Sequence, residues 1–451
     1  MSEIRVSGET VAIRGQARRH RNAWWTLALT ATVVVTGMAY SLWWVPVVRH
    51  GPNGWLLPGD LLGTVRMSTY IGNGYVSYLY SLQTSLVTLP GFAIVFMPFV
   101  KLCAFLHLVP ATTSVPLLRP SEWLLIGPVS MATSGVALAG LDALARVLDT
   151  SLARRRILLV LEAAAIWPVV AIWGHPEDVL ALGFGALALS RALQGRTVSA
   201  GWLLGAALAM QLYAVLLVPI LVGLLGVRRS ADLLGRAAVL PGALFLAMLI
   251  PNAHGTLHAL LDQPNFPTVD YPTPWVLVAP HIGHDVVAAG PGRIVGLLGA
   301  CGLGFLAARR RDDTVAIVWL AAGALALRCL TEAVMDPYYV APAIALALVA
   351  VAPRAPWRAA LTVAAGAALT VLTYDRPGMW WYWLEMAGTF AVLLAPAWRS
   401  RSSARAEEAT ATATSTTTDD LALALVVPGS TATVPSLANV TAGATGVGPP
   451  P

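Results

Sequence analysis

Three titratable side chains stand together where one long apolar segment ends and the next begins. They are His175, Glu177 and Asp178, in the run Gly-His-Pro-Glu-Asp at 174–178. Ionisable residues at the edge of a membrane are costly to insert, so they indicate function. These three are suited to orienting a substrate or a phosphate, or to relaying a proton. Alternatively, Pro176 and the two acids only open the next helix, which explains the acids but not His175.

Arg328 is a charged residue inside an apolar run, in Ala-Leu-Ala-Leu-Arg-Cys-Leu-Thr-Glu. Glu332 follows four residues later, so the two side chains can meet on one helix face. A guanidinium pairs phosphate oxygens with two parallel hydrogen bonds, which favours a phosphate-binding role for Arg328. A purely structural salt bridge is the alternative. Arg66 and Arg293 are weaker candidates for the same phosphate-binding role.

Two further groups of residues have chemical potential. Tyr338 and Tyr339 follow Asp336-Pro337, where they either contact substrate or anchor the chain at the membrane interface. His254 and His258 are four residues apart, a spacing that allows two imidazoles to share a metal on a helix. Because the surrounding segment is rich in proline and no thiol accompanies the pair, we expect solvated or acceptor-contacting side chains there, and no metal or other cofactor.

The composition requires that these residues be positioned by membrane helices. Of the 451 residues, 57% are hydrophobic and only 12% are charged, and the mean hydropathy is +0.69. Soluble domains contain about 25% charged residues, so the chain is a membrane protein with several spans. The net charge of +6 comes almost entirely from arginines in short loops, which indicates membrane orientation and not nucleic-acid binding. The three cysteines lie in or beside apolar spans and are expected to be packing residues.

The chain divides into three regions by hydropathy. Residues 1–23 are a basic tail predicted to lie in the cytoplasm, and residues 24–398 are predicted to form the transmembrane domain. Within that domain, residues 49–85 and 251–290 are predicted to be outer loops that form the active site. Residues 399–451 consist mainly of Ala, Thr, Ser, Pro and Gly, a composition typical of disorder.

An all-α bundle of roughly 11–13 spans follows from the length of the apolar segments and the positive-inside rule. The N-terminal half needs an even number of crossings, so the region from Leu86 to Leu118 is predicted to cross twice, with a break around Lys101. The segment from Ala200 to Gly226 has arginine-rich flanks at both ends and is too short for two full crossings. It is predicted to form a short helical hairpin that turns near Gln211.

Four stretches of the sequence resemble the GT-C superfamily of membrane glycosyltransferases. Within it, the similarity is to polyprenol-phosphate-mannose-dependent transferases of the GT87 or DUF2029 kind. The stretches are Gly59-Asp60 with the Gly/Tyr-rich run that follows, Leu89-Pro90-Gly91 through Met97-Pro98, Gly174 to Asp178, and Gly201-Trp202 through Gln211 and Pro219 with Pro337 to Pro342 downstream. The sequence departs from the family at His175, where glutamine is frequent, and at Gln211, where lysine is frequent.

The resemblance implies a GT-C fold, a polyprenyl-phosphate donor whose sugar is expected to be mannose, and a glycolipid or polysaccharide acceptor. It also implies an active site that faces the extracytoplasmic side of a bacterial plasma membrane. Such transfer needs a base for the acceptor hydroxyl and cations for the departing phosphate. The family places its catalytic acid in the first outer loop, where this chain has Asp60. The alternative for Asp60 is a helix N-cap after Pro58-Gly59.

A transporter or lipid-carrier flippase is the competing function. Transporters place charges near the midplane of several spans and are frequently built from internal repeats. The polar residues of this chain gather at the ends of apolar segments, and no internal repeat is evident. This pattern favours the enzyme.

Overall fold

The computed structural model describes residues 23–44, 59–80, 88–108, 120–265, 271–287, 290–353, 356–375 and 378–395. By its internal contacts the chain separates into Met1–Trp398 and Arg399–Pro451, and every described residue belongs to the first unit. Residues 1–22 of the predicted N-terminal tail (1–23) and the whole predicted tail 399–451 lie outside the described residues.

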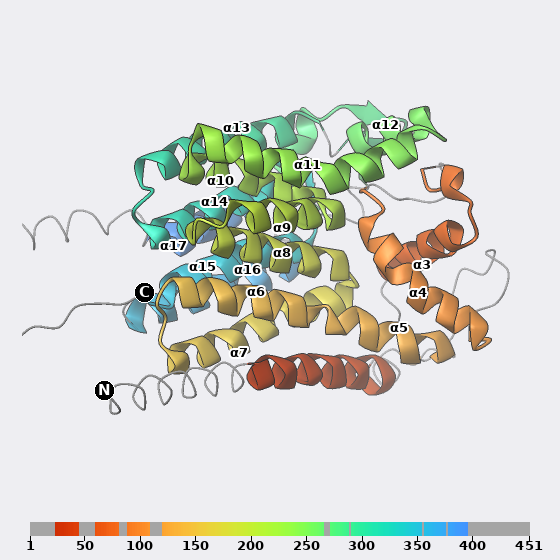
Figure 1. Ribbon diagram of the computed structural model, residues 1–451, viewed down its shortest axis with the longest axis horizontal. Coiled ribbons are helices and arrows are strands. Elements are labelled where there is room, and N and C mark those ends of the chain that lie inside the picture. The colour runs from red at the N-terminus through yellow and green to blue at the C-terminus, as the bar shows by residue number, and fades with distance from the viewer. Residues whose placement is uncertain are drawn as a thin grey trace, which may run out of the picture. The chain divides into compact units, whose positions relative to one another are not determined.

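The described residues form an all-α bundle with a few very short strands (Figure 1). Six segments are helical, long and apolar enough to cross a membrane, as expected for a membrane protein. They are Ala23–Leu42, Trp123–Val147, Leu152–Trp173, Val227–Leu249, Pro291–Arg309 and Thr314–Thr331. Shorter apolar helices occupy Gly91–Phe105, Thr197–Met210, Leu212–Leu225, Pro337–Val351 and Trp357–Thr373.

Helices and helical turns follow one another with short connections. In chain order they are η1 (Tyr40–Trp44), α3 (Gly59–Gly72), η2 (Val76–Tyr78), α4 (Gly91–Phe105), α5 (Pro120–Ala132), α6 (Ser134–Val147), α7 (Leu152–Pro168), η3 (Val169–Trp173), α8 (Pro176–Leu193), α9 (Thr197–Met210), η4 (Leu212–Leu217), α10 (Val218–Leu225), α11 (Val227–Leu249), α12 (Ala253–Leu261), η5 (Pro274–Leu277), α13 (Pro291–Arg309), α14 (Thr314–Thr331), η6 (Pro337–Val340), α15 (Ala341–Val351), α16 (Pro356–Asp375) and α17 (Met379–Leu394).

The interior of the bundle is packed through small residues, as is usual between membrane helices. Gly140 of α6 and Gly183 of α8 face each other so closely that a Cβ on either would meet the other helix's backbone. Gly201 and Gly205 of α9 make the same close approach to α11. Helix α15 is buried along its whole length, so it forms the centre of this packing.

Helices α3, α4 and α12 lie together at one end of the bundle, on the right in Figure 1. Buried side chains of α3, α4, α11 and α12 join in a separate small core there. The predicted outer loops are therefore partly helical. The predicted break at Lys101 is wrong, because α4 continues through that residue. The aliphatic stem of Lys101 lies against Gly72 of α3, so a long side chain at this end need not interrupt its helix.

The predicted break at Gln211 is confirmed. Helix α9 ends at Met210, and Gln211 adopts an extended conformation with φ −153° and ψ 131°. The Gln211 side chain accepts a hydrogen bond from the Leu212 N–H and so caps the 3-10 turn η4. This turn changes the chain direction before α10 and places polar groups at the side of the site described below.

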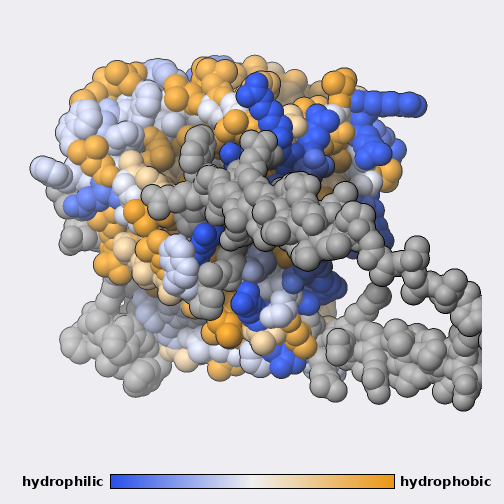
Figure 2. All heavy atoms as spheres, turned by 90° about the vertical axis from the view of Figure 1, so that its left-hand side faces the viewer, coloured by the Kyte–Doolittle hydropathy of each residue, from blue (hydrophilic) through white to orange (hydrophobic). Residues whose placement is uncertain are grey.

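The opposite end of the bundle carries basic turns. The turns between α6 and α7 and between α13 and α14 lie there, on the left in Figure 1. Arg311 donates to the Gly223 carbonyl and Arg154 to the Pro353 carbonyl, so two arginines close neighbouring helix ends. Figure 2 looks onto this end and shows strongly hydrophilic side chains among hydrophobic ones.

Five short strands pair within the second predicted outer loop and with the segment after α14. They are β1 (Pro264–Asn265), β2 (Tyr271–Pro272), β3 (His281–Ile282), β4 (Asp285–Val287) and β5 (Val334–Met335), in the orders β1-β4-β3 and β2-β5. Pairing of Tyr271 with Met335 ties the loop to the chain just before Tyr338 and Tyr339. The loop is thus fixed to the segment that carries the two tyrosines.

Candidate active site

The turn between α7 and α8 presents His175. The π-turn η3 ends at Trp173 and is followed by Gly174, whose φ of +73° and ψ of 39° suit glycine. The His175 N–H then donates to the Val169 carbonyl, and α8 begins at Pro176 with Glu177 and Asp178 in its first turn. The helix-opening role predicted for the acids is confirmed, and the turn also directs the imidazole at them.

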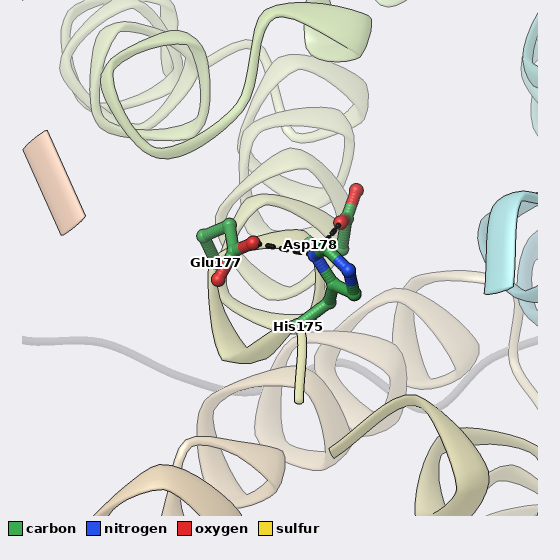
Figure 3. A group of neighbouring side chains, drawn as sticks. All are labelled: His175, Glu177 and Asp178. Atoms are coloured by element: carbon green, nitrogen blue, oxygen red, sulfur yellow. Dashed lines mark hydrogen bonds and ion pairs between the residues drawn. The ribbon is translucent and has the colours of Figure 1, made fainter. Parts of the chain in front are cut away.

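His175 lies between carboxylates from two parts of the chain. Its Nε2 is 2.9 Å from Oδ2 of Asp60, in the first turn of α3, and its Nδ1 is 2.7 Å from Oε1 of Glu177. Asp178 Oδ2 lies 3.6 Å from the same Nδ1. Figure 3 shows the Glu177 and Asp178 carboxylates converging on this edge of the ring. A folded chain thus joins residues 115 positions apart.

Tyr338 supports the imidazole from one face. The two rings are stacked with centroids 3.8 Å apart and an interplanar angle of 20°. The Tyr338 hydroxyl donates to Asp336 Oδ2 at 3.2 Å, which fixes the phenol ring. Tyr338 and Tyr339 are both buried, so the alternative of membrane-interface anchors is wrong for them.

Arg328 occupies the next layer of the site. Its guanidinium lies 3.5 Å from the Tyr339 ring centroid and 5.1 Å from that of Tyr213. Its Nε is 3.5 Å from Glu332 Oε1, which confirms the predicted i,i+4 pair, and its Nη1 is 3.6 Å from Asp178 Oδ1. The arginine therefore links the α14 end to the first turn of α8.

Arg293 approaches the same glutamate from the first turn of α13. Its Nε is 3.4 Å from Glu332 Oε1, and its Nη2 donates to Gln263 Oε1 at 2.6 Å. Glu332 is buried, and the same oxygen of its carboxylate lies near one arginine from α13 and one from α14. This sharing makes the α13–α14 junction a cationic wall.

A cavity of about 1040 Å³ connects these groups. Polar side chains from α3, the α7–α8 turn, α8, α13, the C-terminal end of α14 and η6 face it: Asp60, Arg66, His175, Glu177, Arg293, Arg328, Glu332, Tyr338 and Tyr339. Asp178 does not line the cavity but lies behind the residues that do. Arg66 makes no ion pair with any carboxylate among the described residues. Its charge is therefore open to an anionic ligand.

The electrostatics of the Asp60–His175 pair favour the charged forms of both groups. Two opposing effects act on the pKa of Asp60, whose side chain is 63% exposed. Desolvation by the surrounding protein atoms raises this pKa, but the hydrogen bond with His175 and the imidazolium charge together outweigh that effect and lower it below the ordinary value of 3.8. Burial lowers the pKa of His175, but Glu177, Asp60 and Asp178 together raise it well above 6.5. Asp60 is thus an ionised carboxylate at neutral pH.

Every predicted site residue lines this cavity except Asp178, which contacts its lining. Sequence reasoning missed Tyr213, whose hydroxyl donates to the Asp178 carbonyl at 2.7 Å, and Gln263, the partner of Arg293. Tyr213 stands two residues after the break at Gln211, so the break was an available signal for it. No local pattern distinguishes Gln263.

His258 of the second outer loop also lines the cavity, but its ion pair is with Asp262 and with none of the groups described above. His254 and His258 stack on α12 with centroids 6.2 Å apart, and His258 Nδ1 is 3.4 Å from Asp262 Oδ2. Among the described residues, His175, Glu177 and Asp178 alone form a group of three donors compact enough for one metal ion.

Comparison of the sequence with protein-family models and with curated proteins gives no match.

Proposed function

We propose that this membrane protein is a glycosyltransferase of the GT-C type. In a bacterial plasma membrane, it transfers a sugar, in the first place mannose, from a polyprenyl-phosphate donor to an extracytoplasmic glycolipid or glycan acceptor. One observation carries the proposal: an ionised carboxylate and three arginines line a single cavity of about 1040 Å³ at the end of a membrane bundle opposite its basic turns.

Asp60 is the general base of the proposed reaction. Its Oδ2 contacts His175, which orients the carboxylate, while the exposure of the side chain leaves the other oxygen accessible to an acceptor hydroxyl. Removing that proton as the sugar is transferred makes the hydroxyl a better nucleophile. The acidic residue of the first outer loop has this role in the family that the sequence resembles.

The arginines stabilise the departing phosphate. Arg66 has an uncompensated charge among the described residues, whereas Arg293 and Arg328 share Glu332 at ion-pair distances longer than good hydrogen bonds. Phosphate oxygens offer these guanidiniums shorter, charge-assisted hydrogen bonds. Stabilising negative charge that develops on the leaving group lowers the barrier directly.

The remaining walls suit a lipid-linked donor. Apolar side chains from α9, η4 and α13 line the cavity: Leu208, Leu212, Val215, Leu216, Ile294 and Leu297. Val215, Ile294 and Leu297 are also exposed on the bundle surface, where lipid surrounds a membrane protein. A prenyl chain can therefore lie against apolar surface while its phosphate reaches the arginines.

Transfer from radiolabelled polyprenyl-phosphate mannose tests the proposal, in membranes that contain the wild type, Asp60→Asn or Asp232→Asn at equal expression. Asp232 pairs with Arg236 on α11 and does not line the cavity, so it provides a matched control. We expect transfer by the wild type and the control, and a loss of about 100-fold or more in Asp60→Asn.

Other outcomes separate the parts of the proposal. Full transfer by Asp60→Asn contradicts the role of Asp60 and moves the base to Glu177 or Asp178. No transfer by the wild type from mannose or arabinose donors contradicts the glycosyltransferase itself. Flipping of a fluorescent polyprenyl phosphate by the protein in liposomes then identifies the competing function, a lipid-carrier flippase.

A further inference from the structure

We propose that His175, Glu177 and Asp178 bind one divalent transition-metal ion, such as Zn²⁺ or Mn²⁺, beside the cavity. The ligand set is one imidazole and two carboxylates. Imidazole favours transition metals over Mg²⁺ and Ca²⁺, and carboxylates are compatible with both Zn²⁺ and Mn²⁺. This site is separate from the histidine pair that the sequence offered on α12.

The donor atoms are spaced for a single ion. His175 Nδ1 lies 2.7 Å from Glu177 Oε1 and 3.6 Å from Asp178 Oδ2, and all three donors lie within 4.8 Å of one another. Two ligands of a tetrahedral zinc ion are about 3.3 Å apart. Small rotations of the two carboxylates, both on the first turn of α8, bring the donors to that spacing (Figure 3).

Unsatisfied oxygens in the same place are a second observation. Asp178 Oδ1 and Oδ2 and Glu177 Oε2 are fully buried and accept no hydrogen bond among the described residues. Arg328 Nη1 lies 3.6 Å from Asp178 Oδ1, beyond hydrogen-bond distance, so this ion pair does not supply the missing donor. Buried polar atoms without partners are rare and indicate a missing ion or water. The Asp178 side chain, 3% exposed, faces the imidazole edge where the ion would bind.

Asp60 completes the arrangement from the other side of the ring. A histidine that binds a metal through one nitrogen usually donates its other N–H to a carboxylate, which fixes the ring and raises its basicity. His175 presents Nδ1 to Glu177 and Asp178 and holds Nε2 at 2.9 Å from Asp60. His175 thus has a carboxylate at one ring nitrogen and the other candidate ligands at the second nitrogen, which is the arrangement found around metal-binding histidines.

Charge balance also favours a divalent cation. Asp60, Glu177, Asp178 and Glu332 are four carboxylates, and among the residues that the structure describes only Arg293 and Arg328 pair with this group as permanent cations. With a neutral imidazole, two negative charges of the group have no ion-paired cation, and the nearly buried Glu177 and buried Asp178 carry the largest desolvation cost. One divalent ion removes them, whereas one proton on His175 removes only half of that charge.

The ion would face the cavity, because His175 and Glu177 line it and Asp178 lies behind them. Three protein ligands leave a coordination position for an oxygen of a bound substrate, as in catalytic metal sites. Its role rests on the proposed function: beside the arginines, the cation would help to stabilise the departing phosphate. Binding of the ion itself does not depend on that role.

Metal binding is measured on the purified full-length protein in detergent, first stripped with a chelator and then titrated with Zn²⁺ or Mn²⁺ by calorimetry. We expect one equivalent per chain. Glu177→Gln and Asp178→Asn should each weaken binding more than tenfold, and Asp60→Asn about 10- to 100-fold. The control His258→Gln removes the α12 pair and should leave binding unchanged.

Two measurements keep the result interpretable. The first is the size-exclusion elution volume of each variant, which identifies variants that fail to fold. The second is metal binding by Asp60→Asn, because a substitution of this exposed side chain tests the site without a change in the core. Absence of saturable binding, or binding that only His258→Gln abolishes, overturns the proposed site. Metal binding without sugar transfer contradicts the proposed function alone, and transfer that survives complete metal removal contradicts the catalytic role of the ion.

Discussion

At the scale of single residues, Asp60, His175 and Glu177 form one continuous hydrogen-bonded chain along the wall of the cavity. The imidazole has no choice of orientation, since Tyr338 covers one face and carboxylates contact both nitrogens. A side chain held in this way can keep a nearby carboxylate in one position. Its charge state then determines the stability of the whole group.

The raised pKa of His175 predicts the pH dependence of the metal-free protein. A folded pKa above the unfolded value gives stabilisation that is complete below about pH 6.5 and is lost as the pH rises through the folded pKa. Melting temperatures of chelator-treated wild type and His175→Gln should therefore differ most at pH 6 and converge at alkaline pH. A difference that grows with pH contradicts a protonated imidazole.

Arg328 should contribute to stability far more than Arg236, an exposed arginine of α11. Arg328→Met leaves Asp178 and Glu332 without a buried cation, so we expect a loss of about 3–5 kcal/mol. Arg236→Met breaks an exposed pair with Asp232 and should cost less than about 1 kcal/mol. Thermal or denaturant unfolding of the two variants in detergent compares them, and equal losses contradict this assignment.

At the scale of elements, the cationic wall depends on how closely two helices approach. Helix α13 begins beside the C-terminal end of α14, and a Cβ on Gly292 would collide with the Thr331 carbonyl. Only glycine allows this approach, which brings Arg293 of α13 to Glu332. The contact between helices thus sets the distance between two charged groups.

Gly292→Ala should separate the two helix ends and weaken the site. We expect a destabilisation of about 1–3 kcal/mol and a fall in sugar transfer, because Arg293 moves away from Glu332. Gly302→Ala on the same helix meets no atom within 4 Å and is the matched control. The two variants are compared by melting temperature and by the mannose-transfer assay; equal behaviour would refute the close-approach argument.

At the scale of the whole molecule, basic turns occupy one end of the bundle and the α3–α4–α12 group the other (Figure 1). Arginine-rich loops stay in the cytoplasm, so the cavity end should face outward. This orientation would give a lipid-linked donor and an extracytoplasmic acceptor access to the same cavity.

Cysteine labelling tests that orientation. Ser151 in the α6–α7 turn and His284 between β3 and β4 are both exposed, and each can carry a single cysteine once Cys103, Cys301 and Cys329 are replaced by alanine. A membrane-impermeant thiol reagent should label His284→Cys on intact cells and Ser151→Cys only after permeabilisation. The reverse pattern would place the cavity in the cytoplasm.

The all-α membrane architecture, the break at Gln211 and the pairing of Arg328 with Glu332 could all be predicted from the sequence. These features depend on hydropathy and on helix periodicity, which act over a few neighbouring residues. The family, the reaction and the donor remain predictions from resemblance and chemistry. Only the tertiary structure joined Asp60 to His175, because contacts between distant helices depend on the rotation and close approach of each helix, and local periodicity does not specify these.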